Sequence, residues 1–169
     1  KCTNPVLADY LEACAHLVPD HMANTPMIAV DLETTGLYKK TDQIIAIGWT
    51  LIDEGRIQFG SNRHILIAAE QTVGSSAIIH ELLDNEVATG EPLEHGLEEL
   101  FRAAPGRIWV FHHALLDLAF IKSAGKTWAG VTPGFIVLDT MQIEQRRRHR
   151  RDVPVKEGDL QLGKLRQQY

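Results

Sequence analysis

Two carboxylates at the end of an apolar segment constrain this chain most. Asp31 and Glu33 are separated by one residue at the end of the apolar run 27–33, and a Thr-Thr-Gly turn follows them. Side chains alternate faces along a strand, so both acids point the same way. Neighbouring buried carboxylates repel each other, and a divalent cation such as Mg²⁺ or Mn²⁺ compensates them well through oxygen ligands. The alternative is a strand end whose acids simply reach solvent.

The composition is that of a globular protein large enough for one domain. The chain has 169 residues, of which 44% are hydrophobic and 23% are charged, and it contains no apolar run that would span a bilayer. Cys2 and Cys14 form no metal-type cluster with histidines, which favours reduced thiols and a cytoplasmic location. No signal-peptide pattern is present, although the chain starts at Lys1 rather than at methionine, as expected if a tag or leader precedes it.

The charge is unevenly distributed along the chain. The net charge of −5 is not typical of a purely electrostatic nucleic-acid binder. Residues 146–151, here called the arginine segment, are nevertheless strongly basic, and their arginines are Arg146, Arg147, Arg148, Arg150 and Arg151. Two interpretations remain open. The segment is either a solvated helix end whose cations complement the helix dipole, or a patch that contacts phosphates.

The hydrophobic periodicity predicts a mixed sheet flanked by helices. Three strands in succession favour an antiparallel meander, and later strands alternate with helices. The predicted strands are 27–33, 43–53, 57–67, 107–111 and 135–138. The predicted helices are 5–18 within an N-terminal extension 1–26, 75–84, 92–103, one from 112 that ends at Gly125, one from Asp139 into the arginine segment, and one from near Asp159 to the chain end.

A third acid follows one of the later strands. Asp117 is predicted to lie one turn into the helix that leaves the strand 107–111. Helix N-termini tolerate anions, and the position faces the carboxyl end of the sheet, where α/β proteins usually place their sites. Taken alone, Asp117 is explained by complementing the helix dipole. Its interest lies in its combination with Asp31 and Glu33.

Three motifs taken together resemble a known family. They are Asp31-x-Glu33-Thr34-Thr35-Gly36-Leu37, then His112-His113-Ala114-x-x-Asp117-x-x-Phe120, then Leu138-Asp139-Thr140. Their order and separation resemble the DEDD superfamily of 3′–5′ exonucleases. The chain is most similar to the DnaQ-like histidine branch, which includes the proofreading epsilon subunit of bacterial DNA polymerase III. The resemblance runs from about residue 27 to the end of the chain.

The resemblance implies a ribonuclease H-like fold and hydrolysis of phosphodiester bonds with two Mg²⁺ or Mn²⁺ ions. The implied metal ligands and catalytic residues are Asp31, Glu33 and Asp117. The implied substrate-binding residues are Thr34, Thr35, Gly36, Leu37, His113 and Phe120, with Gly36 permitting a close approach or a positive φ. The implied partners are 3′ ends of single-stranded DNA, or of short RNA, and a DNA polymerase, with no membrane involved.

The sequence departs from the family pattern in two places. His113 stands where the family often has Asn, and structural capping is an alternative role for both His112 and His113. The family's last motif, a general-base His followed five residues later by a fourth metal-binding Asp, is missing here. No His follows His149 and no Asp follows Asp159. We therefore expect an incomplete polypeptide, or an unobserved tail, rather than a naturally inactive enzyme.

Three alternatives remain open from the sequence. Tyr169 would serve the tyrosine branch of the family, but its spacing from Leu162 and Leu165 is typical of a core-facing helix stripe and favours the histidine branch. A noncatalytic binding module with the same fold would use the N-terminal helix or the arginine segment to dock a partner. Residues 161–165 also fit a sliding-clamp motif, or an ordinary amphipathic helix.

Overall fold

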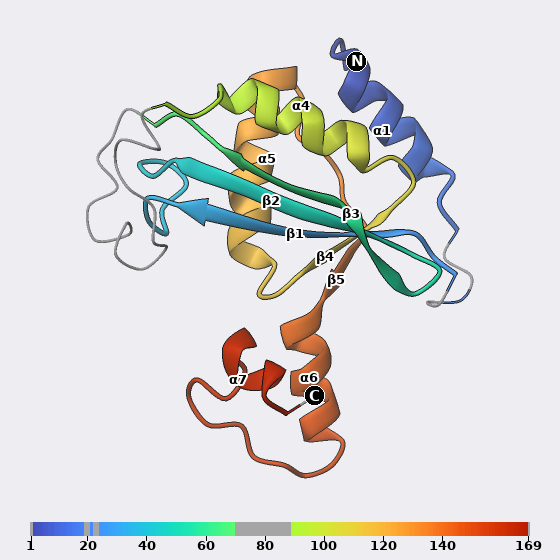
Figure 1. Cartoon of the computed structure of the whole chain (residues 1–169), viewed down its shortest axis with the longest axis vertical. Helices are drawn as coiled ribbons and strands as arrows, with labels where there is room; N and C mark the ends of the chain where they lie inside the picture. Colours follow the sequence, from blue (N-terminus) through green and yellow to red (C-terminus); the bar gives the residue numbers. More distant parts are fainter. Residues whose placement is uncertain (1, 19–20, 22–23, 70–88, 169) are drawn as a thin grey trace.

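A five-stranded mixed sheet organises the computed structural model, which describes residues 2–18, 21, 24–69 and 89–168 (Figure 1). The strands lie in the order β3-β2-β1-β4-β5. They are β1 Met27–Thr34, β2 Ile44–Asp53, β3 Arg56–Leu66, β4 Ile108–Phe111 and β5 Val137–Asp139. The first three strands form the predicted antiparallel meander, whereas β1, β4 and β5 are parallel to one another.

Helices accompany this sheet in the order that the sequence predicts. They are α1 Pro5–Ala15, α4 Leu93–Ala103, α5 Leu115–Ala129, α6 Thr140–His149 and α7 Leu162–Arg166. Figure 1 shows α1 and α4 side by side along the sheet, whereas α6 and α7 lie together beyond the end of β5. The predicted helix 75–84 lies outside the described residues. None of the described helices is long and apolar enough to cross a membrane.

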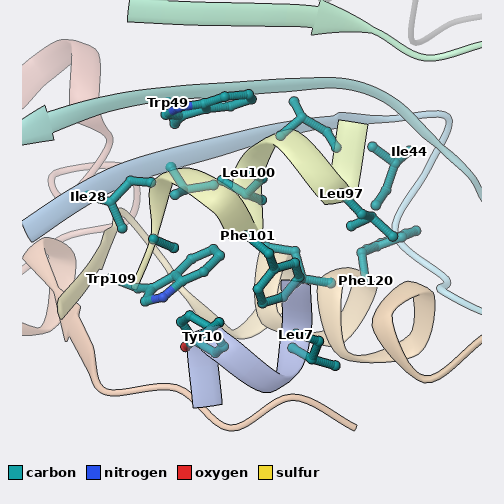
Figure 2. Packing of buried hydrophobic residues seen from close by; sticks show 14 of the residues in the cluster. Leu7, Tyr10, Ile28, Ile44, Trp49, Leu97, Leu100, Phe101, Trp109 and Phe120 are labelled. Carbon is teal, nitrogen blue, oxygen red and sulfur yellow. The ribbon is translucent and has the colours of Figure 1, made fainter. Parts of the chain in front are cut away.

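The N-terminal helix is built into the hydrophobic core (Figure 2). Leu7 and Tyr10 are fully buried. The Tyr10 ring meets the rings of Phe101 and Trp109 edge-on, with centroids 5.0 and 5.9 Å apart, and its hydroxyl donates to the Gly134 carbonyl at 2.8 Å. Burial raises the pKa of Tyr10 well above its ordinary value. The sequence left two roles open for this N-terminal helix, a surface for a partner and internal packing, and the burial of Leu7 and Tyr10 favours packing.

Local signals explain where α1 begins. The Asn4 side chain accepts a hydrogen bond from the Leu7 N–H at 3.1 Å, and Pro5 occupies the first helical position, where a missing N–H costs nothing. The helix ends at Ala15, three residues before the predicted end at residue 18.

Both predicted boundaries of the helix after β4 were wrong. The helix α5 begins three residues later than predicted because His113 adopts a positive φ of 71°, which interrupts the helical path. It also continues past Gly125. A Cβ at Gly125 would lie 2.8 Å from Pro133 Cγ, so this glycine serves close packing inside the helix. The helix ends instead at Gly130, whose φ of 74° is the left-handed conformation typical of a helix C-terminus.

The last helix is shorter than predicted. The Asp159 carboxylate accepts a hydrogen bond from the Lys156 N–H at 2.9 Å in a turn, and α7 begins only three residues after Asp159. Within α7, Leu165 is buried but Leu162 is 53% exposed. The predicted core-facing stripe is therefore correct for Leu165 and wrong for Leu162, and Tyr169 lies outside the described residues.

Candidate active site

The three predicted acids come together at the carboxyl end of the central strands. Asp31 and Glu33 lie in the second half of β1, and Asp117 lies in the first turn of α5. The backbone N–H of Leu32 donates to Asp117 Oδ1 at 3.2 Å, so the helix is fastened to the strand between the other two acids. Charges on both Asp31 and Glu33 act on the Asp117 carboxyl. Residues 84 or more positions apart in sequence thus share one site.

The sheet register explains why Asp117 reaches β1. Pairing of β1 with β4 ends at Ala29 and Val110, whereas β1 itself continues for five more residues to Thr34. The chain leaves the sheet after Phe111 and turns into α5. The edge of β1 beyond Ala29 therefore faces the start of this helix. A backbone N–H on this edge has no partner strand and needs another acceptor. The Asp117 carboxylate is the acceptor for the Leu32 N–H.

The electrostatics of the site disfavour three charged acids without a cation. Burial, followed by the charge of Asp31 and then that of Glu33, raises the pKa of Asp117 to about 7. Asp31 is exposed and Glu33 is half-buried. Hard carboxylate oxygens are the donors that Mg²⁺ and Mn²⁺ prefer, so the residues present fit such ions. Within the described residues, no three His, Cys, Asp or Glu side chains already converge as ligands of one ion.

The Thr-Thr-Gly turn after β1 is held by its own hydrogen bonds. Thr34 Oγ1 donates to the Gly36 carbonyl at 2.7 Å, and Thr35 Oγ1 accepts from the Gln43 N–H at 3.0 Å. A Cβ on Gly36 would lie 2.5 Å from Asp42 Oδ2. The positive φ predicted for Gly36 is not found, and the crowding by Asp42 gives a different reason for glycine here from the predicted approach to a nucleotide. Contact of this turn with a nucleotide stays a prediction.

Exposed apolar side chains flank the acids. The predicted substrate-binding residue Leu37 is 71% exposed, as is Leu115 at the start of α5, and Tyr38 is 76% exposed. Leu115 and Tyr38 were missed because apolar residues in a helix or a turn carry no sign of their exposure in sequence. Phe120, in contrast, is 4% exposed and lines a pocket of about 420 Å³ together with Trp128 and other residues.

The two histidines differ in role. His112 bridges two segments, with Nδ1 2.9 Å from Thr140 Oγ1 and Nε2 2.7 Å from the Leu160 carbonyl, so its geometry supports the structural alternative. His113 is exposed, and its backbone N–H donates to Asp139 Oδ1 at 3.1 Å. Asn and His are among the non-glycine residues that most readily take a positive φ, which accounts for His at a position where Asn is common.

Asp139 connects two helices through one carboxylate. Its oxygens accept hydrogen bonds from the backbone N–H groups of His113 and Ala114, just before α5, and of Met141 and Gln142 in α6. Burial alone would raise the pKa of Asp139, but these four donors outweigh it and lower the pKa below the ordinary value. Sequence reasoning identified this residue as part of a motif and as a helix start, but not as the link that positions α5.

We expect Asp139→Ala to lower the free energy of unfolding at neutral pH by about 2–4 kcal/mol, because two helix N-termini lose a charged acceptor. The folded pKa lies below the unfolded value of 3.8, so this contribution is present above about pH 4 and is lost as the pH falls through the lowered pKa. Urea unfolding near pH 7 and near pH 2, well below the unfolded value, measures the difference in the cost of the substitution, with Asp9→Ala on the exposed face of α1 as the control. An equal loss at both pH values would contradict this account.

Comparisons with known proteins agree with the motifs. No family model matches the chain. The chain is 31% identical over 125 residues to the 3′-5′ exonuclease DinG of Bacillus subtilis (strain 168), covering 70% of the chain and 13% of that protein. It is 33% identical over 125 residues to a PolC-type DNA polymerase III of Caldanaerobacter subterraneus subsp. tengcongensis, covering 70% of the chain and 8% of the polymerase. The chain thus spans only a small part of these relatives.

Solved structures confirm the predicted ribonuclease H-like fold. E. coli exonuclease I in complex with a dT13 oligonucleotide superposes with a TM-score of 0.68 at 11% identity, over 79% of this chain and 32% of that one. Exonuclease I from Methylocaldum szegediense superposes with a TM-score of 0.64 at 13% identity, over 79% of this chain and 32% of that one. At these identities the likeness concerns the fold alone. The sequence relatives support the DnaQ-like 3′–5′ exonuclease family, and they do not distinguish its histidine branch from its tyrosine branch.

Proposed function

We propose that this chain is the nuclease domain of a metal-dependent 3′–5′ exonuclease that removes nucleotides from the 3′ ends of single-stranded DNA. The observation that carries the proposal is the meeting of Asp117 with Asp31 and Glu33 at the end of β1, where a buried acid has a pKa raised to about 7 by burial and by its acidic neighbours. The likeness to DinG, a named 3′-5′ exonuclease, supports it.

The proposed roles of the residues follow from their places. Asp31, Glu33 and Asp117 would hold two Mg²⁺ or Mn²⁺ ions, which would supply activation of water and stabilisation of the leaving 3′ oxygen when bound. Leu37, on the turn after β1, and Leu115, at the start of α5, present exposed apolar surface for the terminal base. The internal hydrogen bonds of the turn keep its backbone rigid, which favours a fixed position of the terminal nucleotide.

The resemblance assigns the general-base His and a fourth Asp to a motif that follows the helix predicted near the chain end. This sequence does not contain that motif, so activity is best tested on the full-length gene product. The integration of α1 into the core supports a single domain over residues 1–169. The likeness to a PolC-type enzyme supports a DNA polymerase as a partner of the full-length protein.

The test is digestion of 5′-labelled oligodeoxythymidylate by the full-length gene product. We expect a ladder that shortens from the 3′ end with Mn²⁺ or Mg²⁺ and no cleavage after chelation by EDTA. A circular single strand of the same sequence, which has no 3′ end, is the matched control and should stay intact. Degradation of a short RNA but not of DNA would favour the RNA exonuclease alternative. Cleavage of neither would sink the proposal and favour a noncatalytic binding module.

A further inference from the structure

The arginine segment divides into two groups in the structure. Arg148 is buried, and its guanidinium contacts Glu144 Oε1 at 2.9 Å, Gln168 Oε1 at 2.9 Å and Asp159 Oδ2 at 3.6 Å. Arg147 pairs with Glu144 Oε2 at 3.2 Å. Arg148 thus holds Asp159 and Gln168 against α6, whereas Arg147 forms an ion pair within the helix, so the presence of both arginines is explained by structure.

The other three arginines have no such side-chain partners among the described residues. The side chains of Arg146, Arg150 and Arg151 are exposed, and among the described residues no hydrogen bond or ion pair engages them. Glu144, the single acid between residues 140 and 151, is already occupied by Arg147 and Arg148. Arg146 shares the last turn of α6 with Arg147 and Arg148, where cations complement the helix dipole. Among the described residues, however, Arg146, Arg150 and Arg151 form no ion pair, and these three cations gather on a chain whose net charge is −5.

A pocket of about 530 Å³ lies along this surface and has two chemically distinct walls. Gln145, Arg146, His149 and the C-cap residue Arg150 form one wall, and positions 146 and 150 share one side of the helix end because they are four residues apart. Arg151 lies outside this pocket and lines a neighbouring one. The loop 153–155, a Val-Pro-Val sequence, forms the apolar wall. Cationic groups beside apolar surface suit a single nucleic-acid strand, which presents phosphates together with sugars and bases.

The helix α6 links this surface to the candidate active site. Its N-terminus is fastened by Asp139 to the residues that precede α5, and Figure 1 shows it running away from the sheet beyond β5. Ten helical residues extend about 15 Å. Successive phosphates of a stacked strand are about 3.4 Å apart along the axis, so a strand leaving the site would reach the end of α6 after roughly four nucleotides or more.

We propose that Arg146, Arg150 and Arg151 bind the phosphate backbone of the DNA strand whose 3′ end occupies the carboxylate site. This proposal rests on the proposed exonuclease function and adds to it a second contact, several nucleotides from the reacting end. This second contact makes the affinity for DNA depend on the length of the strand. A substrate too short to reach α6 gains nothing from the arginines, whereas a longer strand is held at two points.

The test compares charge removal at two ends of the molecule. Arg146→Gln with Arg150→Gln removes two cations from the proposed surface. Arg56→Gln with Lys126→Gln is the matched control, because both side chains are exposed and, among the described residues, neither forms an ion pair. Arg56 lies beside the β2–β3 turn, and Lys126 lies in the last turn of α5, at the other end of that helix from Asp117. Each full-length variant is titrated with fluorescein-labelled oligodeoxythymidylate of about 20 nucleotides in EDTA, and binding is followed by anisotropy over a range of salt concentrations.

We expect the slope of log binding constant against log salt to become shallower by about 1.4 in the first variant, since each phosphate contact of a single strand contributes about 0.7. The slope of the control variant should equal that of the wild type. Equal slopes in all three proteins would overturn the proposal even if the protein degrades DNA. With Mn²⁺, hydrolysis of a dinucleotide should be unchanged in both variants. If the wild type hydrolyses neither the dinucleotide nor the longer strand, the exonuclease function itself is wrong, whatever the slopes.

Discussion

Replacing Asp117 by Asn should abolish hydrolysis and, at the same time, stabilise the metal-free protein above neutral pH. The loss of activity follows from the proposed mechanism, because the neutral amide removes one anionic ligand from the metal site. Metal ions supply several kcal/mol of transition-state stabilisation, so we expect kcat of the full-length protein to fall by about 10³-fold or more. Asp31→Asn should lose activity to a similar extent.

The gain in stability follows from the pKa of Asp117. The folded state raises this pKa from 3.8 to about 7, chiefly through burial and the charge of Asp31, so folding favours the protonated carboxyl. The stability that it contributes is complete below about pH 4 and is lost as the pH rises through about 7. The amide introduced by Asp117→Asn never ionises, and its oxygen is still able to accept from the Leu32 N–H. We expect a gain of about 1–4 kcal/mol near pH 8.

Urea unfolding of the wild type and of Asp117→Asn in EDTA, near pH 4 and near pH 8, measures this effect. The variant should be the more stable protein at pH 8, and the difference should shrink towards pH 4. Asp9→Asn, on the exposed face of α1, should alter neither activity nor stability. Mn²⁺ should raise the unfolding midpoint of the wild type more than that of Asp117→Asn. A variant that keeps a tenth of the activity would contradict the proposed site.

Replacing Tyr10 by Ala should lower the free energy of unfolding by about 3–5 kcal/mol, the cost of removing a large buried ring from a core. Tyr10 is fully buried, its ring contacts the rings of Phe101, Trp109 and Phe135, and its hydroxyl donates to the Gly134 carbonyl. Domains of this size are stable by about 5–15 kcal/mol, so this one substitution would consume a large part of the total.

Two matched variants separate the contributions of the ring and the hydroxyl. Tyr10→Phe keeps the ring and leaves the Gly134 carbonyl without its donor, which should cost about 1 kcal/mol. Tyr38→Ala removes the same atoms from a side chain that is 76% exposed and should change stability by about 0.5 kcal/mol or less. Denaturant titration of the three proteins provides the comparison. A loss below about 1 kcal/mol in Tyr10→Ala would show that α1 is not part of the cooperative core.

The acids of the candidate site could be predicted from the sequence. The hydrogen bond that connects the strand with the helix at this site could not. Alternation along one strand placed Asp31 and Glu33 on the same face, and helix spacing placed Asp117 in a first turn. The hydrogen bond from the Leu32 N–H to Asp117 depends on where β4 stops pairing with β1, and that register is a property of the assembled sheet. No local pattern encodes it.

The errors at α5 have a similar cause. Gly125 and Gly130 look alike in sequence, yet one lacks a side chain because Pro133 packs against it and the other because the chain takes a left-handed φ. Only the first requirement comes from a tertiary contact, and tertiary contacts override local signals. The arginine segment shows the same limit, because sequence alone did not separate Arg148, which is buried in an ion-pair network, from its exposed neighbours.

The placement of Asp139 changes how inactive variants of this protein should be interpreted. One carboxylate fastens both the helix that carries Asp117 and the helix that ends in the exposed arginines, yet its oxygens are occupied by four backbone amides. A genetic screen that scores nuclease activity would therefore rank Asp139 beside the proposed metal ligands. The defect would be structural in origin, since α5 and α6 would lose their common anchor while the carboxylates of the proposed ligands remained in the chain.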